Sequence, residues 1–585
     1  MPEFRVTRSP LLGLLVAVIG LAAFFVGGER LLDGFVLDLG QLDWPAPRHG
    51  TFLFLLIACG SLTAAGFAFA LRSRDSLGWI EGVSDRTWRM GTVIAGLLVP
   101  LALQQLVLRG VWLTDDEAAY RFGADLLLSG RVSVPSPERP LHFEHAMMVN
   151  NGAWHPNYFL GWPALLAPFA WLGVPGLANP MLAAATIPAL DDLLDRAAGR
   201  RWGRAALLVW LVAPMPAFLA ATMLSHTACL AALAWTAWAV MRSRENRMVH
   251  HGLVGVFFSI AFFVRPVSAL AVGGPLLIFW GLGVVRDRNL RALGAMALPS
   301  SVFALAFFGV NAAQNGSPWL PSYVAGAAHH AANGYRFAFV GNQSEPQQAV
   351  VLGMSAMFAQ TAAGLLRLNF AAFGWPFCFV FLVWAKDRLW WFCLLGGLAG
   401  AAVVLDVGID TFGPVHYAEV LLPLIVLTAT GLAGFARRAG DGLAGGVLVG
   451  LVLVGTLFFW PVRATNASRI AWSIERPMER VEGLDDALVF AMWPFTAQAC
   501  DITPTKHLRF GRPLPRPDRS GPVLWANHLT LASDRWLADQ FPDRVAYLLF
   551  YDGSCEFQLV PLDAVGDGQI RDAFVGGNGD LTGYQ

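Results

Sequence analysis

Three acidic residues stand side by side where a long apolar run ends. Residues 113–132 read LTDDEAAYRFGADLLLSGRV, so Asp115, Asp116 and Glu117 closely follow the apolar segment 91–110. A carboxylate in such a place can act as a general base, which takes the proton of a hydroxyl group while its oxygen attacks a substrate. Consecutive helical residues point about 100° apart, so the three carboxylates cannot all face one cavity.

The same residues also have a purely structural interpretation. Thr114 and Glu117 have the spacing of a capping box, and acids in the first turn interact favourably with the helix dipole. Glu117 lies four residues before Arg121, which can in turn reach Asp125. This explains why acids begin a helix, but not why the helix follows an apolar segment.

Histidines crowd the residues that follow. The stretch LHFEHAMMVNNGAWHP holds His142, Glu144, His145 and His155, and three imidazoles with a carboxylate can ligate Zn²⁺. The spacing matches no standard metal motif, so acceptor contacts or ordinary surface polarity are the alternatives, as they are for the two histidines at 329–330. No cofactor is certain, and a divalent metal stays open.

The composition is that of a membrane protein rather than a soluble one, so these residues are expected to lie on elements anchored in a membrane. Of the 585 residues, 56% are hydrophobic and 14% are charged, against about 25% charged residues in soluble proteins. The 41 basic and 41 acidic residues balance, so no basic field indicates nucleic acid. Six cysteines form no disulfide framework, although Cys500 and Cys555 could pair in an extracytoplasmic tail.

The apolar segments predict an α-helical polytopic membrane protein with about 13 transmembrane helices. The predicted spans are 10–27, 51–71, 91–110, 176–193, 205–224, 226–241, 251–266, 268–285, 292–310, 374–385, 389–406, 416–435 and 443–461. Arginine and lysine gather in alternate loops, which predicts a cytoplasmic N-terminus and outer loops 111–175 and 311–373. Segments 157–173 and 347–370 do not fit this alternation as spans. We expect each to lie in or dip into the outer interface, with a tilted or kinked span as the alternative.

The chain changes character after Trp460. The strand-like runs ALVFAMWPF, GPVLWAN and VAYLLFY, with the helix-like LASDRWLADQFPDR, predict a small extracytoplasmic α/β domain. We therefore expect an N-terminal pair of spans with a cytoplasmic loop (1–90), a main transmembrane domain (91–461) and a C-terminal domain (462–585).

Four segments, in order along residues 91–435, resemble GT-C glycosyltransferases of the family 39, protein mannosyltransferase and aminoarabinose transferase type. They are DEAAYRFGADLLLSG, GWPALLAPFAWLG, FFVRPVSAL and GPVHYAEVLLPLIVLTATGLA. The resemblance implies a GT-C-like fold and transfer of a sugar, with inversion, from a polyprenyl phosphate to an acceptor hydroxyl on the extracytoplasmic face. The acceptor would be a protein, a lipid or a glycan. No nucleotide takes part, and the sequence has no Gly-rich phosphate loop.

The resemblance also implies roles for residues. The family's acidic pair falls on Asp116 and Glu117, with Tyr120 as its aromatic residue. Asp116 is then the predicted base and Asp115 the alternative, while Glu117 is expected to pair with Arg121.

The leaving phosphate of such a reaction needs cations. Arg265 and Arg367 are the candidates, and Arg336 and Arg121 are weaker ones. The alternatives are a buried ion pair for Arg265, which lies within a span, and snorkelling to the interface for Arg367.

Two departures from the family pattern concern histidines. His226 stands in SHT, where many relatives carry an acid, and His416 precedes Tyr417 in GPVHY, where relatives have a basic residue. His226, His416 and Tyr417 are further candidates for substrate binding, and the departures leave the sugar and any metal undecided.

The predicted function is thus that of a membrane hexosyl- or pentosyltransferase, placed in a bacterial inner membrane. Its partners would be the lipid-linked donor, an outer acceptor and the bilayer. A transporter or lipid flippase is the main alternative; it would favour an internal repeat, and the sequence has no evident one. A scaffold that displays the tail domain is a third.

Overall fold

The computed structural model describes residues 13–19, 47–72, 75–145, 147–245, 247–332, 353–404, 413–491, 513–551 and 556–566. The chain divides into two compact units. Unit 1 comprises residues 1–104, 177–305 and 338–466, and unit 2 comprises residues 105–176, 306–337 and 467–585. Arg336, Cys500 and Cys555, which the sequence singles out, lie outside the described residues.

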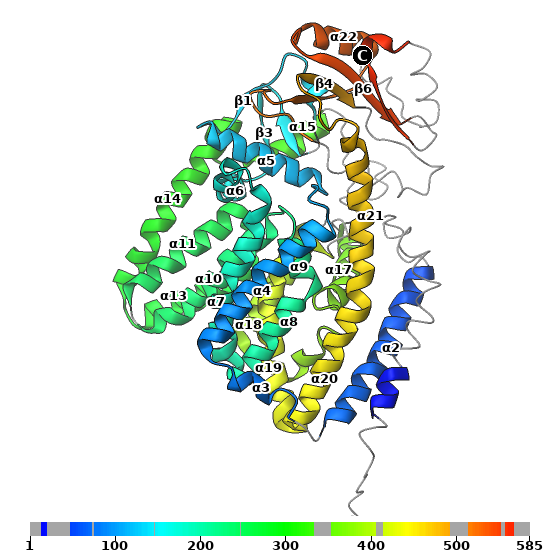
Figure 1. Ribbon diagram of the computed structural model, residues 1–585. Coiled ribbons are helices and arrows are strands. Elements are labelled where there is room, and N and C mark those ends of the chain that lie inside the picture. The colour runs from blue at the N-terminus through cyan, green and yellow to red at the C-terminus, as the bar shows by residue number, and fades with distance from the viewer. Residues whose placement is uncertain are drawn as a thin grey trace, which may run out of the picture. The chain divides into compact units, whose positions relative to one another are not determined.

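Unit 1 is built from helices (Figure 1). Those that begin in it are α2 (Pro47–Leu71), α3 (Gly78–Gly82), α4 (Asp85–Leu106), α7 (Ala178–Ala198), α8 (Arg200–Val212), α9 (Pro214–Ala220), α10 (His226–Arg242), α11 (Met248–Val264), α12 (Pro266–Ser268), α13 (Gly274–Arg286), α14 (Leu290–Asn315), α17 (Gly353–Ala371), α18 (Arg388–Val404), α19 (Leu421–Ala439), α20 (Asp441–Val454) and α21 (Trp460–Glu479).

Among the described residues, five helices are long and apolar enough to cross a membrane. A sixth is obtained if α8 and α9, bent by 55°, form one broken span. These helices support an integral membrane protein, although 13 spans are not found. The predicted span 374–385 is wrong, because only Val380–Trp384 are helical there, as the short 3-10 helix η5. Gly374 at φ +72° and the following Pro376 interrupt any longer helix.

Glycines let α2 and α20 approach closely within unit 1. A Cβ atom on Gly450 would lie 2.6 Å from the Cα atom of Ala64, and one on Gly446 would lie 2.8 Å from the Cα atom of Ala68. This Gly-x-x-x-Gly pair is the small-residue pattern by which membrane helices pack backbone to backbone.

One helical run is much longer than the predicted span 443–461. Helix α20, the π-helical turn η7 (Gly455–Phe459) and α21 continue without a break from Asp441 to Glu479, over 39 residues. A second π-helical turn, η4 (Ala269–Gly273), joins α12 to α13, so Pro266–Arg286 is also one helical run.

Unit 2 contains helices and two small sheets. Its helices are α5 (Asp115–Leu128), η1 (Pro140–Phe143), α6 (Gly161–Trp171), α15 (Ser322–Ala332), α22 (Leu531–Asp539) and η9 (Leu562–Ala564). Its strands are β1 (Val134–Pro135), β2 (Met148–Asn150), β3 (Ala153–Pro156), β4 (Ala487–Ala491), β5 (Val523–Asn527), β6 (Val545–Tyr551) and β7 (Phe557–Pro561). The two interfacial segments of the sequence prediction correspond to α6 here and to α17 in unit 1.

The C-terminal residues form a four-stranded sheet in the order β5-β4-β6-β7. Strand β4 is parallel to β5 and β6, whereas β6 and β7 are antiparallel. Three of the strands and α22 lie within the four segments that the sequence predicts to be regular. Val489, Leu549 and Phe557 form part of the buried core of this sheet.

Candidate functional site

The acidic residues begin helix α5, as the sequence predicts. One oxygen of Glu117, Oε2, accepts hydrogen bonds from the backbone N–H groups of Leu113 at 2.8 Å and Thr114 at 3.0 Å. The capping box is therefore formed, and the Glu117 side chain is buried in it. Arg121 forms its ion pair with Asp125 at 3.1 Å, whereas Glu117, the other expected partner of Arg121, caps the helix.

Asp115 and Asp116 have different surroundings. Asp115 is buried, and its Oδ1 atom lies 3.6 Å from Nε2 of His145. Asp116 is half-buried, and it is the one carboxylate of the three that keeps access to solvent. A general base must reach a substrate hydroxyl, so exposure favours Asp116.

Tyr158 holds the carboxylate of Asp116. Its hydroxyl group donates a hydrogen bond to Oδ1 of Asp116 and lies 3.0 Å from the sulfur of Met147. Burial, and next the charge of Asp116, raise the pKa of Tyr158 well above its usual range, so the hydroxyl stays protonated as the donor. The ring of Tyr120 packs against that of Tyr158 at a centroid distance of 4.7 Å.

The four candidates for metal binding have separate partners. His142 binds Asn527 and Ser533, and Glu144 binds His329 at 3.1 Å. His145 faces Asp115, and Nδ1 of His155 donates to the carbonyl oxygen of Pro156 at 2.8 Å. Within the described part of the chain, no three or more His, Cys, Asp or Glu residues are grouped so that they could hold a metal ion.

A charged cluster in unit 1 contains Arg265 and His226. Both contact Oε1 of Glu419 at 3.2 Å, and the Ser268 hydroxyl donates to Oε2 of Glu419 at 3.1 Å. Arg265 also donates to the hydroxyl oxygen of Ser225 at 3.2 Å. Glu419 is buried, and its negative charge is balanced by the Arg265 guanidinium group and by hydrogen bonds, as a buried charge requires. The buried ion pair weighed for Arg265 in the sequence is thus formed.

The other predicted residues of unit 1 lie on two elements. His416 and Tyr417 belong to the 3-10 helix η6 (Val415–Val420), and the His416 ring is 6.1 Å from that of His226. The Tyr417 hydroxyl lies against Gly364 of α17, where an added Cβ atom would be 2.6 Å away. Arg367, one turn further along α17, is half-buried.

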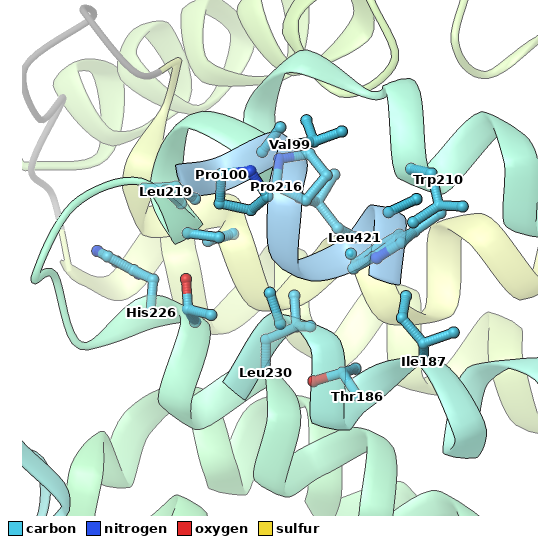
Figure 2. A pocket seen from close by; sticks show the side chains of 18 residues that line it. Val99, Pro100, Thr186, Ile187, Trp210, Pro216, Leu219, His226, Leu230 and Leu421 are labelled. Atoms are coloured by element: carbon cyan, nitrogen blue, oxygen red, sulfur yellow. The ribbon is translucent and has the colours of Figure 1, made fainter. Parts of the chain in front are cut away.

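An apolar cavity adjoins the charged cluster through His226. Its walls come from α4, α7, α8, α9, α10 and the start of α19, and Val99, Ile187, Trp210 and Leu230 lie on them (Figure 2). The cavity measures about 40 Å³.

Sequence reasoning missed two functional candidates. Glu419 lies inside the quoted segment GPVHYAEVLLP, and an acid within an apolar run is itself a signal of a functional or paired residue. Tyr158 gave a weaker signal, because its partner Asp116 is 42 residues away in the sequence.

No protein-family model and no curated protein sequence matches this chain. Solved structures do show similarity. The undecaprenyl phosphate complex of ArnT from Cupriavidus metallidurans is 12% identical, with a TM-score of 0.42, over 79% of this chain and 93% of that one.

Two further similarities have comparable scores. The oligosaccharyltransferase of Archaeoglobus fulgidus is 11% identical, with a TM-score of 0.41, over 80% of this chain and 70% of that one. The arabinofuranosyltransferase AftD from Mycobacteria is 17% identical, with a TM-score of 0.41, over 85% of this chain and 37% of that one. All three are GT-C glycosyltransferases, the family that the sequence motifs resemble. With TM-scores below 0.5, these similarities are partial.

Proposed function

We propose that the chain is an inverting glycosyltransferase of a bacterial inner membrane. It moves a sugar from a polyprenyl-phosphate-linked donor to an acceptor hydroxyl on the extracytoplasmic face. The observation that carries the proposal is the state of Asp116: it is half-buried, keeps access to solvent and accepts a hydrogen bond from Tyr158. Its neighbours are buried, Glu117 as the helix cap and Asp115 against His145.

The reaction assigns each group a task. The acceptor oxygen attacks the anomeric carbon of the sugar, and Asp116 takes the proton of the acceptor hydroxyl. The bond from the anomeric carbon to the phosphate oxygen breaks, and polyprenyl phosphate leaves with the electron pair. Tyr158 fixes one oxygen of Asp116 and favours its ionised form, which is the form that a base needs.

Arg265 and Arg367 are the proposed cations for the phosphate. Arg265 is held by Glu419 and Ser225, so its guanidinium group is preoriented rather than flexible. The ion pair with buried Glu419 also offsets the positive charge of Arg265. Arg265 is therefore expected to orient the phosphate by hydrogen bonds more than to attract it from a distance.

The test is sugar transfer by the purified full-length protein with a panel of radiolabelled undecaprenyl-phosphate sugars. Asp116→Asn should lower the rate by roughly 100-fold or more, because it removes the base without changing the size of the side chain. Asp125→Asn is the matched control on the same helix, and it should stay within about twofold of the wild type. Full turnover by Asp116→Asn would overturn the assignment, and loss in Asp115→Asn alone would move the base to Asp115.

One observation favours the alternative, a transporter or lipid flippase. The cluster of His226, Arg265 and Glu419 places ionisable side chains within apolar helices, where they often serve a transport pathway. Reconstitution in liposomes separates the two functions. Movement of a labelled polyprenyl phosphate between leaflets without covalent transfer would favour the flippase, and transfer would favour the enzyme.

A further inference from the structure

The C-terminal sheet and helix α22 bind the loop around His142 through buried polar groups. The His142 side chain is fully buried. Its Nδ1 atom donates to the carbonyl oxygen of Asn527 at 2.9 Å, and its Nε2 atom accepts from the Ser533 hydroxyl at 2.9 Å. A carbonyl oxygen can only accept, so these partners assign the proton to Nδ1.

Asn527, at the end of β5, binds the backbone of the same loop. Its amide nitrogen donates to the carbonyl oxygens of Leu141 at 3.0 Å and Glu144 at 2.8 Å. The guanidinium group of Arg139 lies 4.3 Å from the ring of Trp536 on α22. Loop and sheet are thus joined by side chains from both partners, and we refer to these contacts of His142 and Asn527 as the latch.

Contacts continue from the latch to the acidic start of α5. Glu144 is bound by His329, and His145 lies 3.6 Å from Asp115. Nδ1 of His145 also accepts the N–H group of Met147 at 3.2 Å. The sulfur of Met147 contacts the Tyr158 hydroxyl, which donates to Asp116. Every residue in this chain of contacts belongs to unit 2.

We infer that the C-terminal domain holds the first-loop acids in position, with Asn527 and His142 as positioning residues. The latch fixes the backbone from residue 141 to 144, and this fixes where His145 and Met147 present their side chains to Asp115 and Tyr158. The inference rests on the proposed function in one respect: it takes Asp115 and Asp116 to be the acids that act in sugar transfer.

One side of the C-terminal sheet packs without the latch. Ala487 and Val489 of β4 pack on one side of the sheet with Leu549 and Phe557. Phe490 points to the opposite side, since side chains alternate along a strand, and its ring lies 5.7 Å from that of His142. Because the core on the first side does not contact His142, variants of the latch should leave that side of the sheet packed.

Hydrogen exchange of the full-length protein in lipid nanodiscs tests the inference. In Asn527→Ala and His142→Ala, amides of residues 139–150 and 113–125 should exchange about tenfold faster, because local opening of the loop becomes easier. Amides of β4 and β6 should keep their protection. His142→Asn, which keeps a donor near the position of Nδ1, should restore most of the protection.

Arg480→Ala is the control, because it removes an exposed ion pair with Glu556 from the same domain without touching the loop. Unchanged exchange at residues 113–125 in both latch variants would overturn the inference, even if residues 139–150 open. If the amides of β4 and β6 also exchange faster in Asn527→Ala, the inference is judged from the His142 variants, because these change a residue of the loop and not of the sheet. The readout needs no substrate, so its failure would leave the proposed glycosyltransferase activity standing.

Discussion

At the scale of single residues, Asp116 differs from its neighbours by environment rather than by type. The three consecutive carboxylates have three different environments. Glu117 caps the helix, Asp115 lies against His145, and Asp116 accepts a hydrogen bond from Tyr158 and keeps access to solvent. For the proposed base, the contact with Tyr158 matters as well, because a hydrogen bond to a carboxylate favours its charged form.

Tyr158→Phe should therefore move the acidic limb of the pH–rate profile to higher pH. The carboxylate of Asp116 loses a donor that stabilises its ionised form, so more of it is protonated at a given pH. The measurement is sugar transfer against pH, with Tyr547→Phe of the C-terminal sheet as control. An unmoved acidic limb would show that Tyr158 does not act on the base.

A second prediction at this scale concerns the pH dependence of the latch. Burial lowers the pKa of His142 below its ordinary value of 6.5, and nearby Arg139 adds to this, while the Asn527 carbonyl and Asp534 oppose it. The unfolded chain then binds more protons than the folded one between the two pKa values. Stability that is present above about pH 6.5 is lost as the pH falls through that window.

The thermal stability of unit 2 should accordingly decrease between pH 7.5 and pH 5.5, and part of the decrease should vanish in His142→Gln. His528, which binds Asp534 beside the latch, is present in both proteins. The difference between the two melting curves therefore isolates His142. Parallel curves would contradict the prediction.

Contacts between residues close in the sequence were predictable from spacing, whereas contacts between residues far apart in the sequence were not. The cap of α5 involves residues three apart, so the spacing of Thr114 and Glu117 predicts it. The partners of Asp115 and Asp116 come from residues 145 and 158, and no periodicity connects such positions. The role of Glu419 is not predictable from its own segment, because its partners His226 and Arg265 come from distant parts of the sequence.

At the scale of elements, the close approach of α19 to η5 replaces the span predicted at 374–385. A Cβ atom on Gly431 would lie 2.0 Å from the carbonyl oxygen of Phe381, and one on Gly434 would lie 2.8 Å from that of Trp384. Residues 374–385 are apolar, and a hydropathy pattern cannot distinguish an apolar segment buried against another helix from an apolar segment that spans a membrane.

Gly431→Ala should destabilise the protein by about 2 kcal/mol or more, because the obstructing atom belongs to the backbone and cannot turn away. Thermal unfolding in detergent measures the effect. Gly281→Ala is the control, since an added Cβ atom on that glycine of α13 meets nothing within 4 Å. Equal stability of the two variants would show that α19 and η5 are not packed this closely.

At the scale of the whole molecule, the loops that the charge pattern assigns to one side of the membrane do meet. In unit 1, Arg201 binds Asp75 and Glu81, from the connection between α2 and α4, and Asp441, at the start of α20. Arg204, one turn later, is buried and donates to the carbonyl oxygens of Ile80 and Val83. Charge bias predicts that these loops share a side of the membrane, but it does not predict which ion pairs they form.

Burial rather than the number of ion pairs should decide the effect of removing these arginines. Arg204→Ala should cost about 3 kcal/mol, because it leaves buried carbonyl groups without their donor. Arg201→Ala should cost about 1 kcal/mol, although Arg201 makes three ion pairs, because the three acids are exposed to solvent. Thermal unfolding of both variants measures the order, and the reverse order would contradict it.

The π-helical turn at Gly455–Phe459 has a consequence for how the chain can change in length. A π-helical turn contains one residue more than the α-helix that it interrupts. Deleting one residue there would turn it into an ordinary helical turn and leave the faces of α20 and α21 where they are. A deletion within α20 would instead rotate all later residues of that helix by about 100°. Single-residue deletions among natural variants of this chain should therefore gather at residues 455–459 of the long helix.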